Sequence, residues 1–196
     1  GLRLEAEFYQ PRFFEFKNTR CQWQTIGNIL TFCQYGSSLP LNEEGRGYPI
    51  FRLNEIDDCL VDEPAKWVVM PAAKYEALKL QVDDILFCRT NGNPNFVGRT
   101  GILKHETDAV FASYLVRIRP NRKYILPEFL TVYLNTRIGR LQIQRRAMHS
   151  NQVNVSAAQL KQIPVPIMGD SFQEKIAERV NDAAERVELS KKKYSQ

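Results

Sequence analysis

The sequence has few of the residues that metal centres and disulfide frameworks need. It holds two histidines and four cysteines in 196 residues, and no two cysteines form a CxxC pair. Structural zinc sites usually combine such closely spaced pairs, so we expect neither a metal site nor a disulfide framework. The acidic residues at 57–58 and 62–63 match no known carboxylate loop and predict a solvated loop. Cys88, within the apolar run 85–88, is expected to be buried.

Familiar catalytic motifs are also missing. There is no GxGxxG or GxxxxGK[ST] phosphate loop and no GxSxG nucleophile elbow. The acid-x-Lys element at 15–17 has no convincing upstream carboxylate, as a nuclease core would need, and no methyltransferase signature is present. We therefore expect a non-catalytic protein without a cofactor. A nuclease or methyltransferase with unfamiliar motifs is the weaker alternative.

Long hydrophobic runs are absent as well. No apolar stretch approaches the roughly 20 residues that a membrane span requires, and no signal peptide is visible. We expect no membrane partner and a cytoplasmic location, which also suits the unpaired cysteines.

Positive charge is present in excess and is unevenly distributed. The net charge is +5. Between residues 117 and 149 the only acid is Glu128, whereas the basic residues are Arg117, Arg119, Arg122, Lys123, Arg137, Arg140, Arg145 and Arg146. Arginine suits bidentate contacts to phosphate and guanine. The pattern therefore indicates a polyanionic partner such as DNA.

Three polar loops have the composition of DNA-contacting segments, at 34–38, 89–99 and 145–154. Arginine reads guanine and asparagine or glutamine reads adenine, whereas hydroxyls and basic groups hold phosphates. Asparagine and glycine are also ordinary turn residues, so each loop alone has a structural explanation, and the three together favour DNA. With Arg52 added, the predicted DNA-binding residues are Tyr35, Ser37, Ser38, Arg52, Arg89, Thr90, Asn91, Asn93, Asn95, Arg99, Arg145, Arg146, Asn151 and Gln152.

Periodicity predicts a β-rich first half and a helical second half. We expect the first twenty residues to form an irregular lead-in on the core and 23–32 to form an apolar stretch. We expect a helical turn at 74–80, and strands at 48–53, 66–70, 82–89, 96–103 and 109–118. A helix is expected from Pro127, because Leu130, Leu134, Ile138 and Leu141 follow at helical spacing. Pro164 and Pro166 are expected to break the chain before the last helix.

The last helix is predicted from Asp170 or Ser171, either of which can cap it, to Tyr194, with three lysines in its final turn. A narrow apolar stripe follows it, as in one strand of a coiled coil. A terminal helix packed on its own domain fits the periodicity equally well. The stripe residues assigned to a partner helix are Phe172, Ile176, Val180, Ala183, Val187 and Tyr194.

The order of these segments resembles the specificity subunits of type I restriction–modification systems. The similarity is carried by residues 3–11, 23–37, 48–56, 84–92 with 97–99, 150–155, 160–166 and 173–176. Two departures are Asp83, where the family usually has glycine, and Ile167, where it usually has a second proline.

The resemblance implies an α+β, β-rich target recognition domain at 1–168 and a coiled-coil-type spacer helix at 170–196. Such a domain binds one half of a bipartite site in double-stranded DNA. Its helix would pair with a second recognition domain or a second copy of the chain, and would dock methyltransferase subunits, which the restriction subunit joins. Chemistry would belong to those partners. The specificity domain of a single-chain restriction–methylation enzyme and a protein–protein adaptor remain as alternatives.

Overall fold

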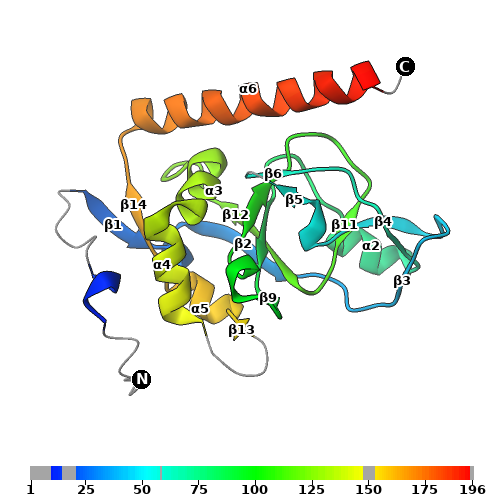
Figure 1. Cartoon of the computed structure of the whole chain (residues 1–196), viewed down its shortest axis with the longest axis horizontal. Coiled ribbons are helices and arrows are strands. Elements are labelled where there is room, and N and C mark those ends of the chain that lie inside the picture. The colour runs from blue at the N-terminus through cyan, green and yellow to red at the C-terminus, as the bar shows by residue number, and fades with distance from the viewer. Residues whose placement is uncertain (1–9, 15–20, 58, 148–152, 195–196) are drawn as a thin grey trace.

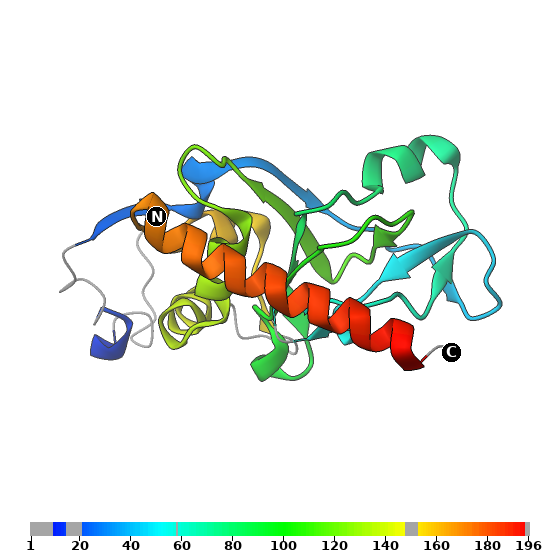
Figure 2. The same ribbon diagram turned by 90° about the horizontal axis from the view of Figure 1, so that it is seen from above.

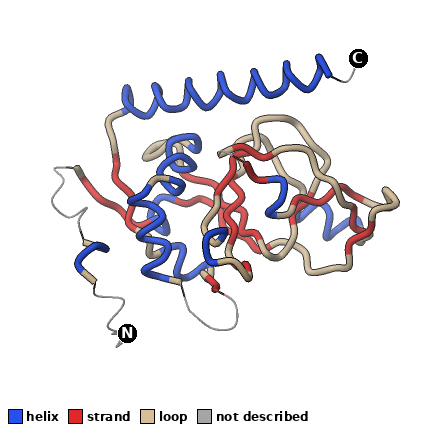
Figure 3. Tube along the Cα trace, viewed as in Figure 1, coloured by secondary structure: helices blue, strands red, loops and turns tan. Residues whose placement is uncertain are grey.

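The computed structural model describes residues 10–14, 21–57, 59–147 and 153–194. Strands fill the centre and one end of the molecule, helices cover the other end, and a long C-terminal helix runs across both (Figures 1 and 3). This arrangement confirms the expected α+β fold. Among the described residues, no helix combines the length and the apolar character that a membrane crossing requires.

A mixed six-stranded sheet forms the centre of the molecule. Its neighbours are antiparallel except β10 and β6, which run parallel. Every residue of β8 is buried, as predicted for a strand enclosed on both faces. In spatial order the strands are β2 (Leu30–Tyr35), β12 (Leu115–Pro120), β8 (Ile85–Cys88), β10 (Thr100–Ile102), β6 (Leu60–Val61) and β5 (Ile56–Asp57).

Alternate side chains of β8 supply two separate hydrophobic cores, because successive residues of a strand point to opposite faces. Ile85 and Phe87 pack among the helices, whereas Leu86 and Cys88 pack towards the second sheet. Burial raises the pKa of the Cys88 thiol to about 11. The prediction that Cys88 is a small buried residue is confirmed.

A four-stranded sheet underlies the second core. Tyr48, the first residue of strand β4 (Tyr48–Phe51), stacks on Tyr75 of helix α2 (Ala72–Leu78), with 3.8 Å between the ring centroids. The strands expected at 48–53 and 66–70 are present but shorter. In spatial order the strands are β11 (Val110–Phe111), β4 (Tyr48–Phe51), β7 (Trp67–Val68) and β3 (Leu41–Asn42), and a 3₁₀ helix at Leu53–Glu55 follows β4.

The helix predicted from Pro127 through Leu141 is wrong in one respect, since it is two helices. Thr136 separates them with an extended backbone, and its hydroxyl accepts a hydrogen bond from the Gly139 amide at 3.2 Å. Gly139 lies so close to the Tyr133 carbonyl oxygen that a Cβ would be 2.1 Å from it. The turn therefore leaves Ile138 exposed. The helices are α3 (Pro127–Asn135) and α4 (Arg137–Arg146).

The chain break expected at Pro164 and Pro166 is instead a strand. β14 (Pro164–Ile167) pairs antiparallel with β1 (Gln22–Thr25) in a two-stranded sheet. Proline is tolerated there because, among the described residues, one side of each strand has no strand partner. The Tyr133 hydroxyl donates to the Pro164 carbonyl at 2.6 Å and holds β14 against α3.

Other segments predicted as continuous are divided. The stretch 23–32 is interrupted by the short helix α1 (Ile26–Ile29). The segment 109–118 contains β11 of the four-stranded sheet and the first part of β12 of the six-stranded sheet. The segment 96–103 begins in a 3₁₀ helix (Pro94–Phe96) before β10. The lead-in lies partly outside the described residues. Its 3₁₀ helix Pro11–Phe13 buries Phe13 against α4, as expected.

Part of the basic cluster lies inside the protein. Asp84 is fully buried and pairs with both Arg117 and Arg119 of β12. Hydrogen bonding to Asp84 raises the pKa of Arg119, whereas burial lowers the pKa of Arg117. Arg117 also donates to the Ala77 and Lys79 carbonyls at 3.0 and 2.7 Å, at the end of α2. These two arginines therefore stabilise the fold. The expectation that the whole basic stretch contacts a polyanion is wrong for Arg117 and Arg119.

The C-terminal helix α6 (Asp170–Tyr194) is confirmed and runs lengthwise across the domain (Figure 2). The helix begins at Asp170, and the carbonyl of the preceding Gly169 accepts a hydrogen bond from the Phe172 amide at 3.0 Å. Gly169, and not Asp170 or Ser171 as expected, therefore precedes the first helical residue. Gln173 is buried and accepts from the Leu126 amide at 2.8 Å. The helix thus packs on its own domain, chiefly along α3.

Candidate nucleic-acid interface

The second and third polar loops are joined by strand pairing. β9 (Thr90–Asn91) pairs antiparallel with β13 (Val153–Asn154). The Thr90 hydroxyl also donates to the Val153 carbonyl at 3.1 Å. Both strands lie on the side of the domain that faces away from α6 (Figure 1).

The first loop joins this pair through Tyr35, at the end of β2. The Tyr35 hydroxyl accepts a hydrogen bond at 2.8 Å from the backbone amide of Ala157, the first residue of α5 (Ala157–Lys161). The Arg89 guanidinium lies over the Tyr35 ring, 5.0 Å from its centroid. Tyr35 remains 44% exposed. Tyr35, the second loop and the described end of the third loop, β13, therefore lie together. Ser38, which is exposed, follows three residues after Tyr35.

Arg89 is partly a scaffold residue. Its Nη1 donates to the Ser113 carbonyl at 3.3 Å, and its own carbonyl accepts from the Val155 amide at 2.8 Å. The side chain is half-buried. Arg89 thus ties the surface to the underlying sheet while its stacked guanidinium stays near the exposed ring.

The asparagines of the second loop shape it and stay accessible. Asn91 Oδ1 accepts from the Asn93 amide at 2.8 Å, and Asn93 Oδ1 accepts from the Asn95 amide at 3.0 Å. Such turns are typical of asparagine. Asn93 and Asn95 are exposed. Within the described residues the Nδ2 groups of Asn91 and Asn93 have no hydrogen-bond acceptor, so both can donate to a ligand.

Helix α4 supports the second loop from beneath. Arg140 donates to the Asn95 carbonyl at 2.6 Å, and burial lowers its pKa. The sequence marked Arg140 as basic but not as a loop anchor, because its partner lies 45 residues away. The guanidinium of Arg99 lies over the Phe96 ring at 4.6 Å and has no hydrogen bond to the other described residues. Of the two arginines of this loop, Arg99 therefore makes fewer contacts that stabilise the fold than Arg89 does.

The contact between this loop and α4 requires glycine at 98. Gly98 has φ +85, and a Cβ there would lie 2.7 Å from the Ile143 side chain. Gly98→Ala is expected to lower the free energy of unfolding by about 1–3 kcal/mol, through a left-handed backbone and a clash. Urea denaturation measures this. Gly92→Ala, in the same loop, meets nothing within 4 Å and is the matched control. Equal effects of the two changes would contradict the argument.

Two predicted residues do not lie on this surface. Ser37 is buried, and its hydroxyl accepts from the Leu39 amide at 3.2 Å, so its role is structural. Arg52 forms an ion pair at 2.6 Å with the buried Glu55 and caps the 3₁₀ helix beside β4. We correct both assignments.

The remaining predicted residues belong to the third loop. Arg145 and Arg146 end α4, where Arg145 stacks on Phe14 at 4.1 Å and Arg146 donates to Gln142. Asn151 and Gln152 lie outside the described residues. The two arginines thus form the C-terminal end of α4, the helix that supports the second loop.

Residues 22–196 match the family model of the type I restriction modification DNA specificity domain. The chain belongs to this family. Its similarity to the specificity subunit of the type I restriction enzyme EcoKI from Escherichia coli K12 is 30% identity over 135 residues. That match covers 67% of this chain but 28% of the relative, so the chain spans well under half the length of that protein.

Solved structures show the same fold. The S subunit of a type I restriction–modification system from M. genitalium superimposes with a TM-score of 0.57 at 16% identity, over 88% of this chain and 41% of that one. The type IIG restriction endonuclease BpuSI gives a TM-score of 0.60 at 10% identity, over 86% of this chain and 27% of that one. At these identities the likeness concerns the fold alone.

Proposed function

We propose that this chain reads one half of a bipartite sequence in double-stranded DNA, as the target recognition domain of a type I specificity subunit. The observation that carries the proposal is the convergence of the described parts of three polar loops, remote in sequence, on one side of the domain. Tyr35, the β9–β13 pair and the Arg140–Asn95 bond hold them together. A rigid scaffold that presents variable loops is well suited to reading base edges.

The loop chemistry suggests a division of labour. The donor groups of Asn91 and Asn93 suit adenine or backbone acceptors, and Arg99 suits guanine or phosphate. Nothing in this arrangement requires the chain to be an enzyme. Methylation and cleavage would be carried out by methyltransferase and restriction subunits bound to the same assembly, and the cofactors would be theirs.

Residues 1–168 would form the recognition domain and residues 170–196 the spacer helix. The helix would pair with a second such helix through its exposed side, where Ala183 lies. Phe172 and Val187 keep exposed surface, but Phe172 packs edge-on against Phe129 of α3 and Val187 lines the cavity between α6 and the domain. Ile176 and Val180 pack against the chain's own domain, so we withdraw them from the partner surface. The side chain of Tyr194 lies outside the described residues.

Ala183→Asp is expected to abolish pairing of the helices and leave the domain folded, because Ala183 is exposed. Val180→Asp is the matched change on the inward side, and it should destabilise the domain because it places an unpaired charge in the core. Light scattering and thermal unfolding separate the two effects. Assembly that is unchanged in Ala183→Asp would exclude this exposed face as the pairing surface.

A second candidate is the specificity domain of a single-chain restriction–methylation enzyme. The fold shared with BpuSI favours it. DNA reading by the loops would be the same, and only the covalent context would differ. An adaptor without DNA affinity is the remaining alternative.

The test is selection of bound duplexes from a random pool, using this chain together with its methyltransferase subunit. We expect enrichment of a short half-site or of a bipartite palindrome. A folded complex that enriches no sequence would overturn the proposal in favour of the adaptor. Binding that weakens as salt rises is a further expected property.

A further inference from the structure

Three potential metal ligands converge where the C-terminal half of α6 meets the domain. They are Glu63, which follows β6, His105, which follows β10, and Glu188 of α6. One ligand atom from each lies within 4.8 Å of the other two. The three residues come from separate segments, so their meeting is a property of the tertiary fold.

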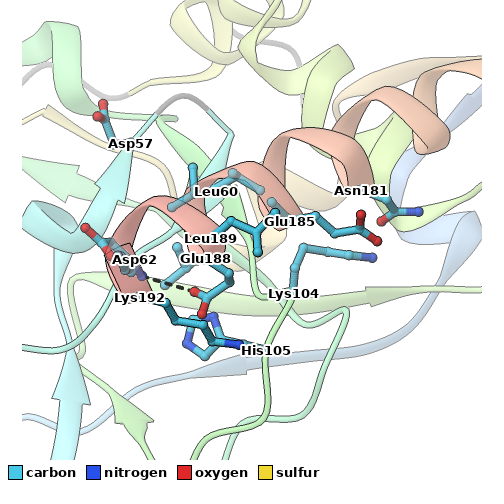
Figure 4. A pocket seen from close by; sticks show the side chains of 14 residues that line it. Asp57, Leu60, Asp62, Lys104, His105, Asn181, Glu185, Glu188, Leu189 and Lys192 are labelled. Carbon is cyan, nitrogen blue, oxygen red and sulfur yellow. Dashed lines mark hydrogen bonds and ion pairs between the residues drawn. The ribbon is translucent and has the colours of Figure 1, made fainter. Parts of the chain in front are cut away.

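The surroundings leave space for an ion and its water ligands. A cavity of about 680 Å³ lies between α6 and the segments around β5 and β6, and both His105 and Glu188 line it. Figure 4 shows the Glu188 carboxylate next to the His105 ring. The Nε2 atom of His105 is buried and has no hydrogen-bond partner in the part of the chain that the structure describes, although Glu63 Oε1 is 3.7 Å away. A buried ring nitrogen without a partner is uncommon, because burial of an unsatisfied polar atom costs free energy.

A cation already lies among these groups. The Lys191 ammonium is 3.2 Å from Glu188 Oε1, 3.7 Å from Glu63 Oε1 and 2.6 Å from Asp62 Oδ1. The carboxylates therefore create a position that favours positive charge. The Lys191 side chain is 30% exposed, so it can turn towards solvent when another cation takes this position.

We propose that Glu63, His105 and Glu188 bind a divalent transition-metal ion, which fastens α6 to the domain. One imidazole and two carboxylates suit zinc and its neighbours, whereas magnesium and calcium prefer oxygen ligands alone. Three protein ligands leave one tetrahedral position for water from the cavity. The inference is independent of DNA recognition, because none of the three ligands belongs to the loops of the proposed interface.

The sequence alone predicted no metal site, for a clear reason. Glu63 was placed in a solvated acidic loop, and neither His105 nor Glu188 is near it along the chain. Binding would link three segments that are otherwise held by ion pairs with partly exposed carboxylates. It would therefore restrict motion of the C-terminal half of α6 relative to the domain.

The test is calorimetric titration of zinc ions into the chelator-treated chain, accompanied by thermal unfolding. We expect one ion per chain and a higher melting temperature with zinc. His105→Ala and Glu188→Gln should weaken binding at least ~10-fold, because loss of even an outer-sphere partner typically costs that much. Lys191→Ala should strengthen binding, since it removes the competing charge.

Matched controls distinguish this site from others that bind zinc. His149→Ala removes the only other histidine, and Glu185→Gln removes a carboxylate of the same helix that lines the cavity. Both should bind zinc as the unaltered chain does, as should chain whose cysteines are alkylated. The proposal is overturned if the unaltered chain binds no zinc, if binding survives His105→Ala, or if it is lost on alkylation.

Discussion

Arg99→Ala is expected to weaken binding of the selected duplex by roughly 1–3 kcal/mol, or about 5- to 150-fold in Kd. Arg99 lies on the central loop of the proposed interface, and its guanidinium stacks on Phe96 without a hydrogen bond to the other described residues. Its donors are thus available to DNA at little structural cost. The measurement is a fluorescence-anisotropy titration of the chain with its methyltransferase subunit.

Arg46→Ala provides the matched control. Arg46 is exposed, lies between β3 and β4, and pairs with Glu44 at 3.1 Å. It removes the same charge from the domain, so the two variants separate a local contact from a general loss of positive potential. Titrations at several salt concentrations extend the test: a phosphate contact by Arg99 lowers the salt slope by about 1, whereas a base contact relaxes specificity at one position. Equal affinity of both variants would remove the central loop from the DNA face.

Elements whose evidence is local were predictable from the sequence. β8 is a short apolar run next to strong turn residues, and α6 has apolar residues at helical spacing with lysines in its last turn. In both cases the spacing of apolar residues along the segment is enough to indicate the type of element. The strand β4 was found for the same reason.

Elements that depend on distant partners were not predictable in this way. Pro164 and Pro166 locally indicate a break, and only pairing with β1, from the other end of the chain, makes this segment a strand. The division of the α3–α4 helix depends on Thr136 and on the tight contact at Gly139, neither of which disturbs the apolar spacing.

The candidate site shows the same limit. Composition located the three loops, but it could not distinguish the exposed Asn93 from the buried Ser37. Charge clustering included Arg117 in a basic stretch that indicates a polyanionic partner, whereas Arg117 pairs with the buried Asp84. Glu63, His105 and Glu188 gave no signal at all, because their proximity exists only in the folded chain.

Asp84→Ala is expected to lower the free energy of unfolding by about 3–5 kcal/mol, as is typical when one partner of a buried ion pair is removed. The Asp84 carboxylate is fully buried, pairs with Arg117 and Arg119, and accepts from the Gln81 amide at 2.9 Å. Its removal leaves Arg117, whose pKa burial already lowers, without its counter-ion inside the domain. Urea denaturation followed by circular dichroism measures the change.

Asp108→Ala separates burial from the mere loss of an ion pair. The Asp108 carboxylate is 77% exposed and pairs with Lys79 at 2.7 Å, so solvent replaces the lost partner and the effect should be much smaller. Replacing Asp84, Arg117 and Arg119 together by Leu, Met and Met should recover part of the stability, because all three charges are then removed and none is left alone in the interior. Equal effects of Asp84→Ala and Asp108→Ala would mean that water reaches the arginines of β12. The six-stranded sheet would then owe its stability to its apolar faces alone, and the arginines of β12 would return as candidates for binding a polyanion.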